Sequence, residues 1–449
     1  MFPNPQDALP LPPHPNLEQY KKLAKELVKA CKSEQSEAIG DWVVRWMEGL
    51  ARLNETELTP KVRANIDRRS PQIEQFIRSK LQSPEPQARS CVLADAQFVI
   101  ARSHGFLTWL RFVQHLESLS ESSSSISRFE SAADAIIAGD TRTLERLLRE
   151  DPELIHARST REHEATLLHY VSANGVEGYR QKSPQNAAAI TEILLKAGAK
   201  VDATAVVYRG ACTALELVAT SAPPLQAGVQ KAVIETLLAY GAAVDGAPGG
   251  PGMIIQCMGN GCREAAELLA ERGARLTIES AAALGRLEVV RSFFNEDGSL
   301  KPNATRDEML SAFLWACMHG RHDVIEFLLQ HGAEIDTQAN LGQTGLHWAV
   351  ITADLDTIRF LLKLGAPLEV RNVYSGTVLG QALWSAAHSG PRKDYVAVIE
   401  TLVAAGAKVP ERHAPVNDRI DELLERFGSR SDDEMTWFGE PPKKKKKQQ

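Results

Sequence analysis

The chain lacks the features that mark most secreted, membrane and nucleic-acid-binding proteins. Its 449 residues include 6 cysteines and no Cys-x-x-Cys pair, so no disulfide framework or paired-cysteine zinc site is indicated. No apolar run approaches the roughly 18–20 residues of a membrane span. The N-terminus has no apolar signal region, and a formal net charge of −6 offers no basic surface for nucleic acid. We therefore expect reduced, mostly buried thiols in a cytoplasmic protein.

Catalytic and cofactor-binding motifs are also missing. There is no G-x-S-x-G nucleophile elbow and no phosphate loop with its Lys-Ser/Thr ending. His163 and His169 are too far apart for the H-E-x-x-H zinc pattern. Cys317, His319 and His322 are metal-ligating types, but no fourth ligand is evident and they straddle a glycine turn. The sequence therefore predicts no metal, no cofactor and no catalysis.

What the chain does contain is a recurring helix end. A Leu-Leu or Leu-Val pair followed closely by Gly-Ala occurs six times, and successive glycines lie 43, 32, 59, 33 and 41 residues apart. The glycines are Gly198, Gly241, Gly273, Gly332, Gly365 and Gly406. A period of roughly 20–50 residues is typical of a solenoid, in which each unit buries its apolar face against its neighbours. The 59-residue spacing is interpreted as holding a further unit that has lost its Gly-Ala.

The seventh unit shows which solenoid this is. From Thr344 it reads T-G-L-H-W-A and then continues to a Leu-Leu helix end. This resembles an ankyrin repeat, whose first helix opens with T-P-L-H-x-A at a period of roughly 33 residues, with Gly345 replacing the proline. The resemblance covers residues 128–427. It implies an all-α, ankyrin-type helix-pair solenoid of about eight repeats with short hairpin loops, preceded by a small helical domain. His169 and His347 are expected to be structural, each hydrogen-bonded to the threonine three residues earlier.

Composition sets the expected domain boundaries. Six prolines mark residues 1–15 as a disordered segment, and a serine run marks residues 119–127 as a flexible linker. The linker separates an N-terminal helical domain, 16–118, from the solenoid with its C-terminal cap, 128–427. The tail, 428–449, carries five consecutive lysines and is expected to be disordered.

The helical domain resembles an uncharacterised module that precedes ankyrin repeats in many bacterial proteins. The resemblance lies in L-A-D-A-Q-F-V-I-A-R from Leu93, followed by G-F-L-T-W from Gly105; Ser103-His104 depart from the expected pair. It implies a bacterial origin and no particular activity. Four prolines within residues 54–90 predict only short helices there.

Binding is the function that the pattern favours. The fifth residue of the first helix faces the concave groove in this architecture, and aromatic side chains occupy that position in repeats two, six and seven, whereas Leu217 and Gln381 occupy it in repeats three and eight. Hairpin tips add further aromatic and arginine side chains, which are enriched at interfaces. The predicted partner-binding residues are Tyr170, Tyr208, Arg209, Trp315, Asn340, Trp348, Arg371 and Tyr374. The alternative, that these rings pack between repeats as core, stays open at this point.

The sequence thus predicts a monomeric scaffold that binds a partner protein through the concave face and hairpin tips, and neither nucleic acid nor a membrane. The main alternative is an enzyme whose site lies in the N-terminal helical domain, with Arg102, His104 and His115 as its polar groups and the repeats as a targeting arm. A deep pocket around strongly shifted titratable groups would favour that alternative. A third reading assigns binding of anionic polymers or membrane surfaces to the lysines at 443–447.

Overall fold

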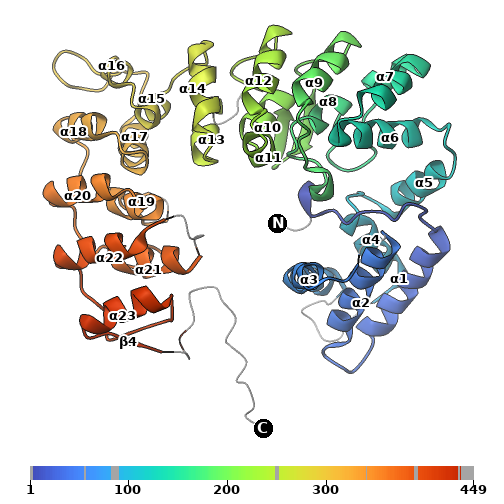
Figure 1. The fold of residues 1–449 in the computed structure, drawn as a ribbon, viewed down its shortest axis with the longest axis horizontal. Helices are drawn as coiled ribbons and strands as arrows, with labels where there is room; N and C mark the ends of the chain where they lie inside the picture. Colours follow the sequence, from blue (N-terminus) through green and yellow to red (C-terminus); the bar gives the residue numbers. More distant parts are fainter. Residues whose placement is uncertain are drawn as a thin grey trace. The chain divides into compact units, whose positions relative to one another are not determined.

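The computed structural model describes residues 4–54, 57–81, 91–247, 252–339, 341–388, 393–432 and 435. The chain divides into two compact units, Met1–Ala274 and Arg275–Gln449. Within the described residues, helices dominate and the strands have two to four residues. The predicted all-α solenoid of helix pairs is confirmed, and each unit shows successive pairs packed side by side (Figure 1).

The first unit opens with helices that form a core of their own. They are α1 (Leu17–Cys31), α2 (Ala38–Leu53), α3 (Pro60–Leu81), α4 (Leu93–Ser103) and α5 (Trp109–Leu119). The Asn16 side chain accepts a hydrogen bond from the Glu18 amide at 2.9 Å and so caps the start of α1. Apolar side chains at helical spacing then bury one face of α1, among them Ala24 and Leu27, which are fully buried.

Three expectations for this region are wrong. The segment predicted to be disordered forms a short 3-10 helix, η1 (Pro5–Asp7), and the Leu9 amide donates to the Ser103 carbonyl at 2.8 Å. Helix α6 begins at Ser125, inside the serine run predicted as a linker, because the Ser124 hydroxyl caps it. The stretch predicted to hold only short helices contains α3, which runs for 22 residues through Pro71. Pro71 cannot donate the backbone hydrogen bond that continues the helix, but burial of the apolar face of α3 stabilises the helix by more than this loss.

The rest of the first unit consists of paired helices joined by hairpins and insertions. The elements are α6 (Ser125–Ala138), α7 (Thr141–Glu150), η3 (Pro152–His156), α8 (Leu167–Tyr170), η4 (Gly178–Arg180), α9 (Ala187–Lys196), β1 (Thr204–Val207), β2 (Gly210–Thr213), α10 (Ala214–Ala219), α11 (Ala222–Gln226), α12 (Gln230–Ala239), α13 (Met253–Gly259) and α14 (Arg263–Glu271). Strands β1 and β2 form an antiparallel hairpin that pairs Thr204 with Thr213 and Val207 with Gly210. The segments between α8 and α9 and between α10 and α12 are long and contain η4 and α11.

The second unit is a more regular series of pairs. Its elements are α15 (Ile278–Leu284), α16 (Leu287–Arg291), α17 (Arg306–Met318), α18 (His322–Gln330), α19 (Gly345–Thr352), α20 (Leu355–Lys363), α21 (Val378–His388), α22 (Tyr395–Ala404), β3 (Arg412–His413), α23 (Asp418–Arg426) and β4 (Arg430–Ser431). One continuous apolar core runs from Ile278 to Leu424. Because Ile420, Leu423 and Leu424 join that core, α23 covers the last repeat as the predicted cap.

The helix-opening histidines have the structural role predicted for them. The Thr344 amide donates to Nδ1 of His347 at 3.2 Å, and the Thr344 hydroxyl lies 2.9 Å from the same atom. Thr166 and His169 repeat this arrangement at 3.1 and 2.8 Å. Both rings are fully buried, and burial lowers the pKa of His169 to about 4. Each ring is therefore neutral, with Nδ1 accepting a hydrogen bond.

The cysteines only partly follow the sequence prediction. Cys31 and Cys91 form a disulfide with their Cα atoms 6.2 Å apart, so the expectation of reduced thiols fails for this pair. Cys212, Cys257, Cys262 and Cys317 are free. In the described part of the chain, no helix combines the length and apolar character that crossing a membrane requires.

Candidate functional site

A groove of 750 Å³ opens in the first unit beside the hairpin β1–β2. Its walls come from the loop after α8, the hairpin, the α10–α11 corner and helix α13. Half of the lining residues are polar: Asn174, Gln181, Tyr208, Glu216, Thr220, Ser221, Gln256 and Asn260. Gln181, in the segment after α8, and Pro223, in α11, both contribute to it. The irregular repeats therefore build a concavity that uniform repeats would not make.

The hairpin tip at this groove has an unusual backbone. Tyr208 and Arg209 have φ angles of +52° and +65°, the left-handed region in which a two-residue hairpin turn usually places Asn-Gly. A bulky residue in that region is strained by roughly 1–3 kcal/mol. Such strain persists only where the surroundings hold it, and it gathers at functional sites. The tip thus presents a tyrosine and an arginine where stability alone favours smaller residues.

Contacts around Tyr208 hold its ring at the groove. Its hydroxyl donates to Oδ1 of Asn174, whose Nδ2 donates in turn to the Leu217 carbonyl at 3.1 Å. The ring stays 52% exposed. The carboxylate of Glu216 also lines the groove, and its Oε2 accepts the Thr213 amide at 2.7 Å. The groove therefore combines an exposed aromatic ring with a carboxylate fixed by its own helix cap.

The second unit carries a series of tryptophans on neighbouring first helices. Trp315 on α17 and Trp348 on α19 each lie five residues before a left-handed residue that ends the helix, Gly320 or Ala353. Because stacked repeats superpose, equivalent positions face the same side. Both rings are half-buried. Trp384 on the next first helix, α21, is 42% exposed. Helix α19 packs against both α17 and α21, so the three rings lie on neighbouring first helices, although Gln381 and not Trp384 corresponds to Trp348 in its repeat.

Histidines one turn further along brace two of these tryptophans. Trp315 stacks on His319 with ring centroids 5.7 Å apart, and Trp384 stacks on His388 at 4.5 Å. Trp348 instead packs against the apolar core of the unit. The first and third rings are thus held by local contacts, while the middle one also supports the repeat. The sequence left open whether these rings form an interface or pack as core. The structure gives a different result at each position.

Hairpin tips of the same unit add exposed apolar side chains. Leu341, Val373 and Tyr374 are 44%, 58% and 46% exposed. The Val373 amide donates to the Leu341 carbonyl at 3.0 Å, so consecutive tips lie in contact. Arg371 is exposed, and its guanidinium donates to the Ser375 carbonyl at 2.7 Å. These tips and Trp384 form what we call the tip-and-tryptophan surface: Leu341, Arg371, Val373, Tyr374 and Trp384.

The fifth-residue rule used for the sequence prediction is wrong. Tyr170 is fully buried, with Phe129 edge-on to its ring at 6.0 Å and the Arg180 guanidinium 5.8 Å from its centroid. Leu217 and Gln381 are buried as well. Helix α8 is a single turn, and the insertion that follows it brings Arg180 over the tyrosine. Tyr170 is thus core, and Asn340 lies outside the described residues.

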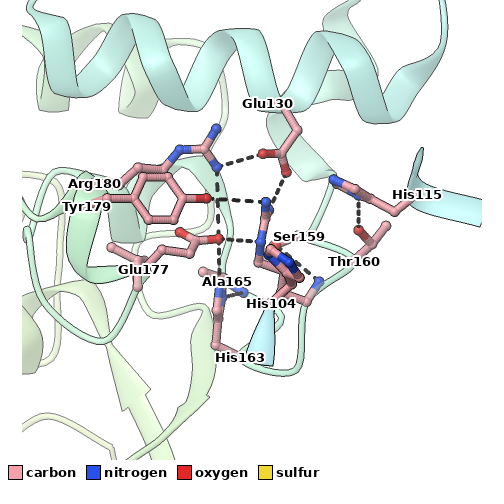
Figure 2. Close-up of polar contacts among 12 residues, drawn as sticks. His104, His115, Glu130, Ser159, Thr160, His163, Ala165, Glu177, Tyr179 and Arg180 are labelled. Atoms are coloured by element: carbon pink, nitrogen blue, oxygen red, sulfur yellow. Dashed lines mark hydrogen bonds and ion pairs between the residues drawn. The ribbon is translucent and has the colours of Figure 1, made fainter. Parts of the chain in front are cut away.

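A buried charge cluster lies where the first repeats meet the N-terminal helices, and the sequence prediction missed it. Arg161 pairs with Glu130 at 2.6 Å and with Glu177 at 2.9 Å. Arg180 approaches the second oxygen of Glu130 at 2.6 Å and Asp134 at 2.8 Å. Figure 2 shows Arg180 directed at Glu130, with Glu177 nearby. Two carboxylates thus bridge two guanidiniums inside the fold.

Burial and pairing set the protonation of this cluster. Burial alone would raise the pKa of Glu177, but Arg161, His163 and Arg180 outweigh it and hold that pKa well below its ordinary value. The same balance brings the pKa of Glu130 to about 2. The Ala165 amide donates to Nδ1 of His163 at 3.1 Å, so Nε2 carries the proton and points toward Glu177 at 3.3 Å. Both carboxylates are therefore ionised at neutral pH.

Two of the three residues of the enzyme alternative lie next to this cluster. His104 donates from Nδ1 to the Leu9 carbonyl at 2.9 Å, and His115 contacts the Thr160 hydroxyl at 2.8 Å. Burial lowers the pKa of His104 to about 4 and that of His115 to about 3. Arg102 instead pairs with Glu162 at 2.6 Å. The shifted titration that would favour an enzyme is therefore present.

The cavities that the described residues of this cluster line are small. The cavities that touch Glu130 and Arg161 measure 50 and 10 Å³, against roughly 300–1,000 Å³ for an ordinary ligand site. Within the described residues, no group of three or more His, Cys, Asp or Glu side chains is arranged to hold a metal ion. The cluster is best explained as a polar junction between the N-terminal helices and the repeats. Nothing in the local sequence marks it, because its members come from separate segments.

Comparison with known proteins identifies the repeats. Residues 278–372 match the family model for ankyrin repeats in three copies, so the second unit carries ankyrin repeats as predicted. No curated protein sequence matches the chain. Among solved structures, the human ASB11 ankyrin repeat domain is 21% identical, with 62% of this chain and 98% of that chain covered and a TM-score of 0.34. The ankyrin repeat domain of Bcl-3, a member of the IkappaB family, is 20% identical, with coverages of 56% and 92% and a TM-score of 0.27. At these TM-scores neither structure informs the function of this chain.

Proposed function

We propose that this ankyrin-repeat protein is a scaffold that binds a partner protein through the tip-and-tryptophan surface of its second unit and the groove of its first. Ankyrin repeats are generally protein–protein interaction modules. The observation that carries the proposal is the exposure of Trp384, Tyr374 and Val373 on adjoining parts of one repeat. Tryptophan, tyrosine and arginine dominate the energetics of protein interfaces.

The two surfaces have different chemical character. The tip-and-tryptophan surface is apolar and aromatic, with Arg371 beside Tyr374. The groove is lined by amide and hydroxyl side chains around Glu216. Side-chain amides and hydroxyls both donate and accept hydrogen bonds, as the peptide groups of an extended polypeptide require. We expect the apolar surface to supply most of the affinity and the groove to contribute specificity.

Replacing Trp384 and Tyr374 together by alanine tests the proposal. Truncating two aromatic side chains of a binding surface weakens capture of the partner by at least about tenfold, because each such side chain is worth roughly 2 kcal/mol or more at an interface. Affinity capture from the native host, with partner amounts quantified by mass spectrometry for wild type and variant, measures this loss.

Two controls separate binding from folding. Tyr240 is 39% exposed at the end of α12, a second helix of its pair, so Tyr240→Ala removes a comparable ring away from both proposed surfaces. It should leave capture unchanged. Thermal unfolding of the double variant should stay close to that of wild type, since both rings lie at the surface, 42% and 46% exposed. A double variant that is folded and captures its partner as well as wild type contradicts the proposal.

A further inference from the structure

A second cavity, unrelated to the proposed protein-binding surfaces, lies in the N-terminal helical domain between α1 and α2. This aromatic cleft measures 250 Å³. Tyr20, Trp42 and Trp46 line it and are 5%, 2% and 5% exposed. Leu23 and Leu50 extend the apolar lining. The lining is thus three aromatic rings joined by aliphatic side chains, a surface on which a flat or slender apolar molecule packs well.

The aromatic side chains of the cleft also carry polar atoms that nothing satisfies. Nε1 of Trp42, Nε1 of Trp46 and the hydroxyl of Tyr20 are buried, and none has a hydrogen-bond partner among the described residues. Indole N–H groups only donate, and a phenol can donate as well. Buried tryptophans and tyrosines usually find a partner, because an unmet donor destabilises the fold. The three unmet donors belong to side chains that line the cleft, but the donor atoms themselves have no exposed surface in it.

Charged residues at the mouth of the cleft determine the sign of the charge on a ligand that would bind there. Arg45 lines the cleft, is exposed, and forms no ion pair with any residue that the structure describes. Glu26 lies on the opposite helix, where Lys22 approaches it at 3.9 Å. Among the described residues, the unpaired charge at the mouth is therefore the positive charge of Arg45.

Gly49 gives independent evidence that the cleft is kept open. It lies inside helix α2, where glycine is less stable than alanine by roughly 1 kcal/mol. It lines the cleft, and a Cβ added there would meet nothing within 4 Å. Packing therefore does not exclude a side chain at this position. Its absence leaves room in the cleft.

We propose that the aromatic cleft binds a small apolar carboxylate. Its hydrocarbon part packs on Trp42 and Trp46 inside the cleft, and its carboxylate pairs with Arg45 at the mouth. At 250 Å³, the cleft is below the usual size for a drug-like ligand, which restricts the ligand to a single ring or a short chain.

Phenylacetate and 2-phenylethanol are suitable probes, because they share a ring and differ in charge. Calorimetric titration of the full chain with phenylacetate should give saturable binding, with 2-phenylethanol weaker by about tenfold. Proton–nitrogen NMR spectra, with the indole signals assigned by single Trp→Phe variants, should show the Trp42 and Trp46 Nε1–H resonances moving with phenylacetate. Those of Trp315 and Trp384 should stay fixed.

Three variants decide between this site and nonspecific binding. Gly49→Phe fills the cleft and should abolish phenylacetate binding, while the matched control Gly49→Ala should retain it. Arg45→Gln, at an exposed position where misfolding is not expected, should weaken phenylacetate by about fivefold and leave 2-phenylethanol unchanged. The proposal is overturned if phenylacetate shows no binding up to about 10 mM, or if a folded Gly49→Phe protein binds it as well as Gly49→Ala does.

Discussion

Single charged residues decide how the N-terminal helices join the repeats. Arg161 lies with its guanidinium 5.4 Å from the Phe106 ring and between two carboxylates from different segments. Glu162, the next residue, donates its amide to the Gly105 carbonyl at 2.9 Å and pairs with Arg102. Removing one partner of a buried ion pair leaves the other charge uncompensated. The residues of this cluster should therefore be far more sensitive to substitution than exposed ion pairs.

Glu177→Gln tests this sensitivity. The substitution keeps the shape of the side chain but leaves Arg161 and Arg180 with one fewer negative charge, so the free energy of unfolding should fall by about 3–5 kcal/mol. Urea unfolding followed by circular dichroism measures the change. Glu192→Gln is the control, because Glu192 forms an exposed ion pair with Lys196 at 2.8 Å. Loss of this pair should lower the free energy of unfolding by less than about 1 kcal/mol. Equal effects of the two substitutions would show that the cluster does not stabilise the fold.

At the scale of the element, the hairpin β1–β2 combines a strained turn with an exposed side chain. The two turn residues differ in their contacts: the Tyr208 hydroxyl donates to Asn174 at the groove, while Arg209 lies at the tip of the hairpin. The neighbouring backbone also fits closely: the Val206 amide donates to the His163 carbonyl at 2.8 Å. The hairpin is thus anchored along β1, and the strain is confined to the turn.

Two single substitutions in this turn should have different consequences. Arg209→Gly relieves the left-handed backbone and should raise the free energy of unfolding by about 0.5–1 kcal/mol while keeping the Tyr208 ring at the groove. Tyr208→Asn relieves the same kind of strain but removes the ring from the groove, so capture should weaken. Thermal unfolding and quantitative capture of both variants check this. Loss of capture in Arg209→Gly with none in Tyr208→Asn would show that the tyrosine is not the binding group.

At the scale of the whole molecule, the two units differ in their buried titratable groups. The first contains His104, His115 and His169, whose pKa values burial lowers from 6.5 to about 4, 3 and 4, and the carboxylates of the charge cluster. In the second unit, burial lowers the pKa of His347. The histidines and the ion-paired carboxylates both lower the stability of the fold as the pH falls. A histidine with a lowered pKa binds its proton first in the unfolded chain, and an ion-paired carboxylate loses its stabilising charge on acidification.

Acidification should therefore destabilise the first unit before the second. The loss should begin as the pH falls below about 6.5, each histidine contributing up to about 1.4 kcal/mol per pH unit. The loss of stability should continue below pH 4.5, because glutamates of the unfolded chain then bind protons that the ion-paired Glu130 and Glu177 of the folded chain do not. Hydrogen exchange with mass spectrometry at pH 7, 6 and 5 measures protection in each unit separately. Uniform loss of protection in both units would contradict the expected order.

The sequence by itself determined the repeat architecture, because its signals are local. A glycine after an apolar helix and a Thr-x-x-His cap each depend on neighbours within one turn, and Thr344 with His347 has the contacts that were predicted. Serine and proline runs were less informative: Ser124 caps a helix and α3 continues through Pro71, since packing against other segments overrides local preference.

Only the tertiary structure decided which side chains are buried and which are exposed. Tyr170 and Trp348 fill similar positions in their repeats, yet the first is covered by the insertion that carries Arg180 and the second remains half exposed. The charge cluster, the polar groove and the aromatic cleft each bring together residues from separate segments. Repeat period and helix caps are properties of neighbouring residues, whereas burial, ion pairing and cavity shape depend on contacts between distant ones. For this reason the fold was predictable from the sequence, whereas the candidate sites were predicted only in part, at hairpin-tip residues such as Tyr208 and Tyr374.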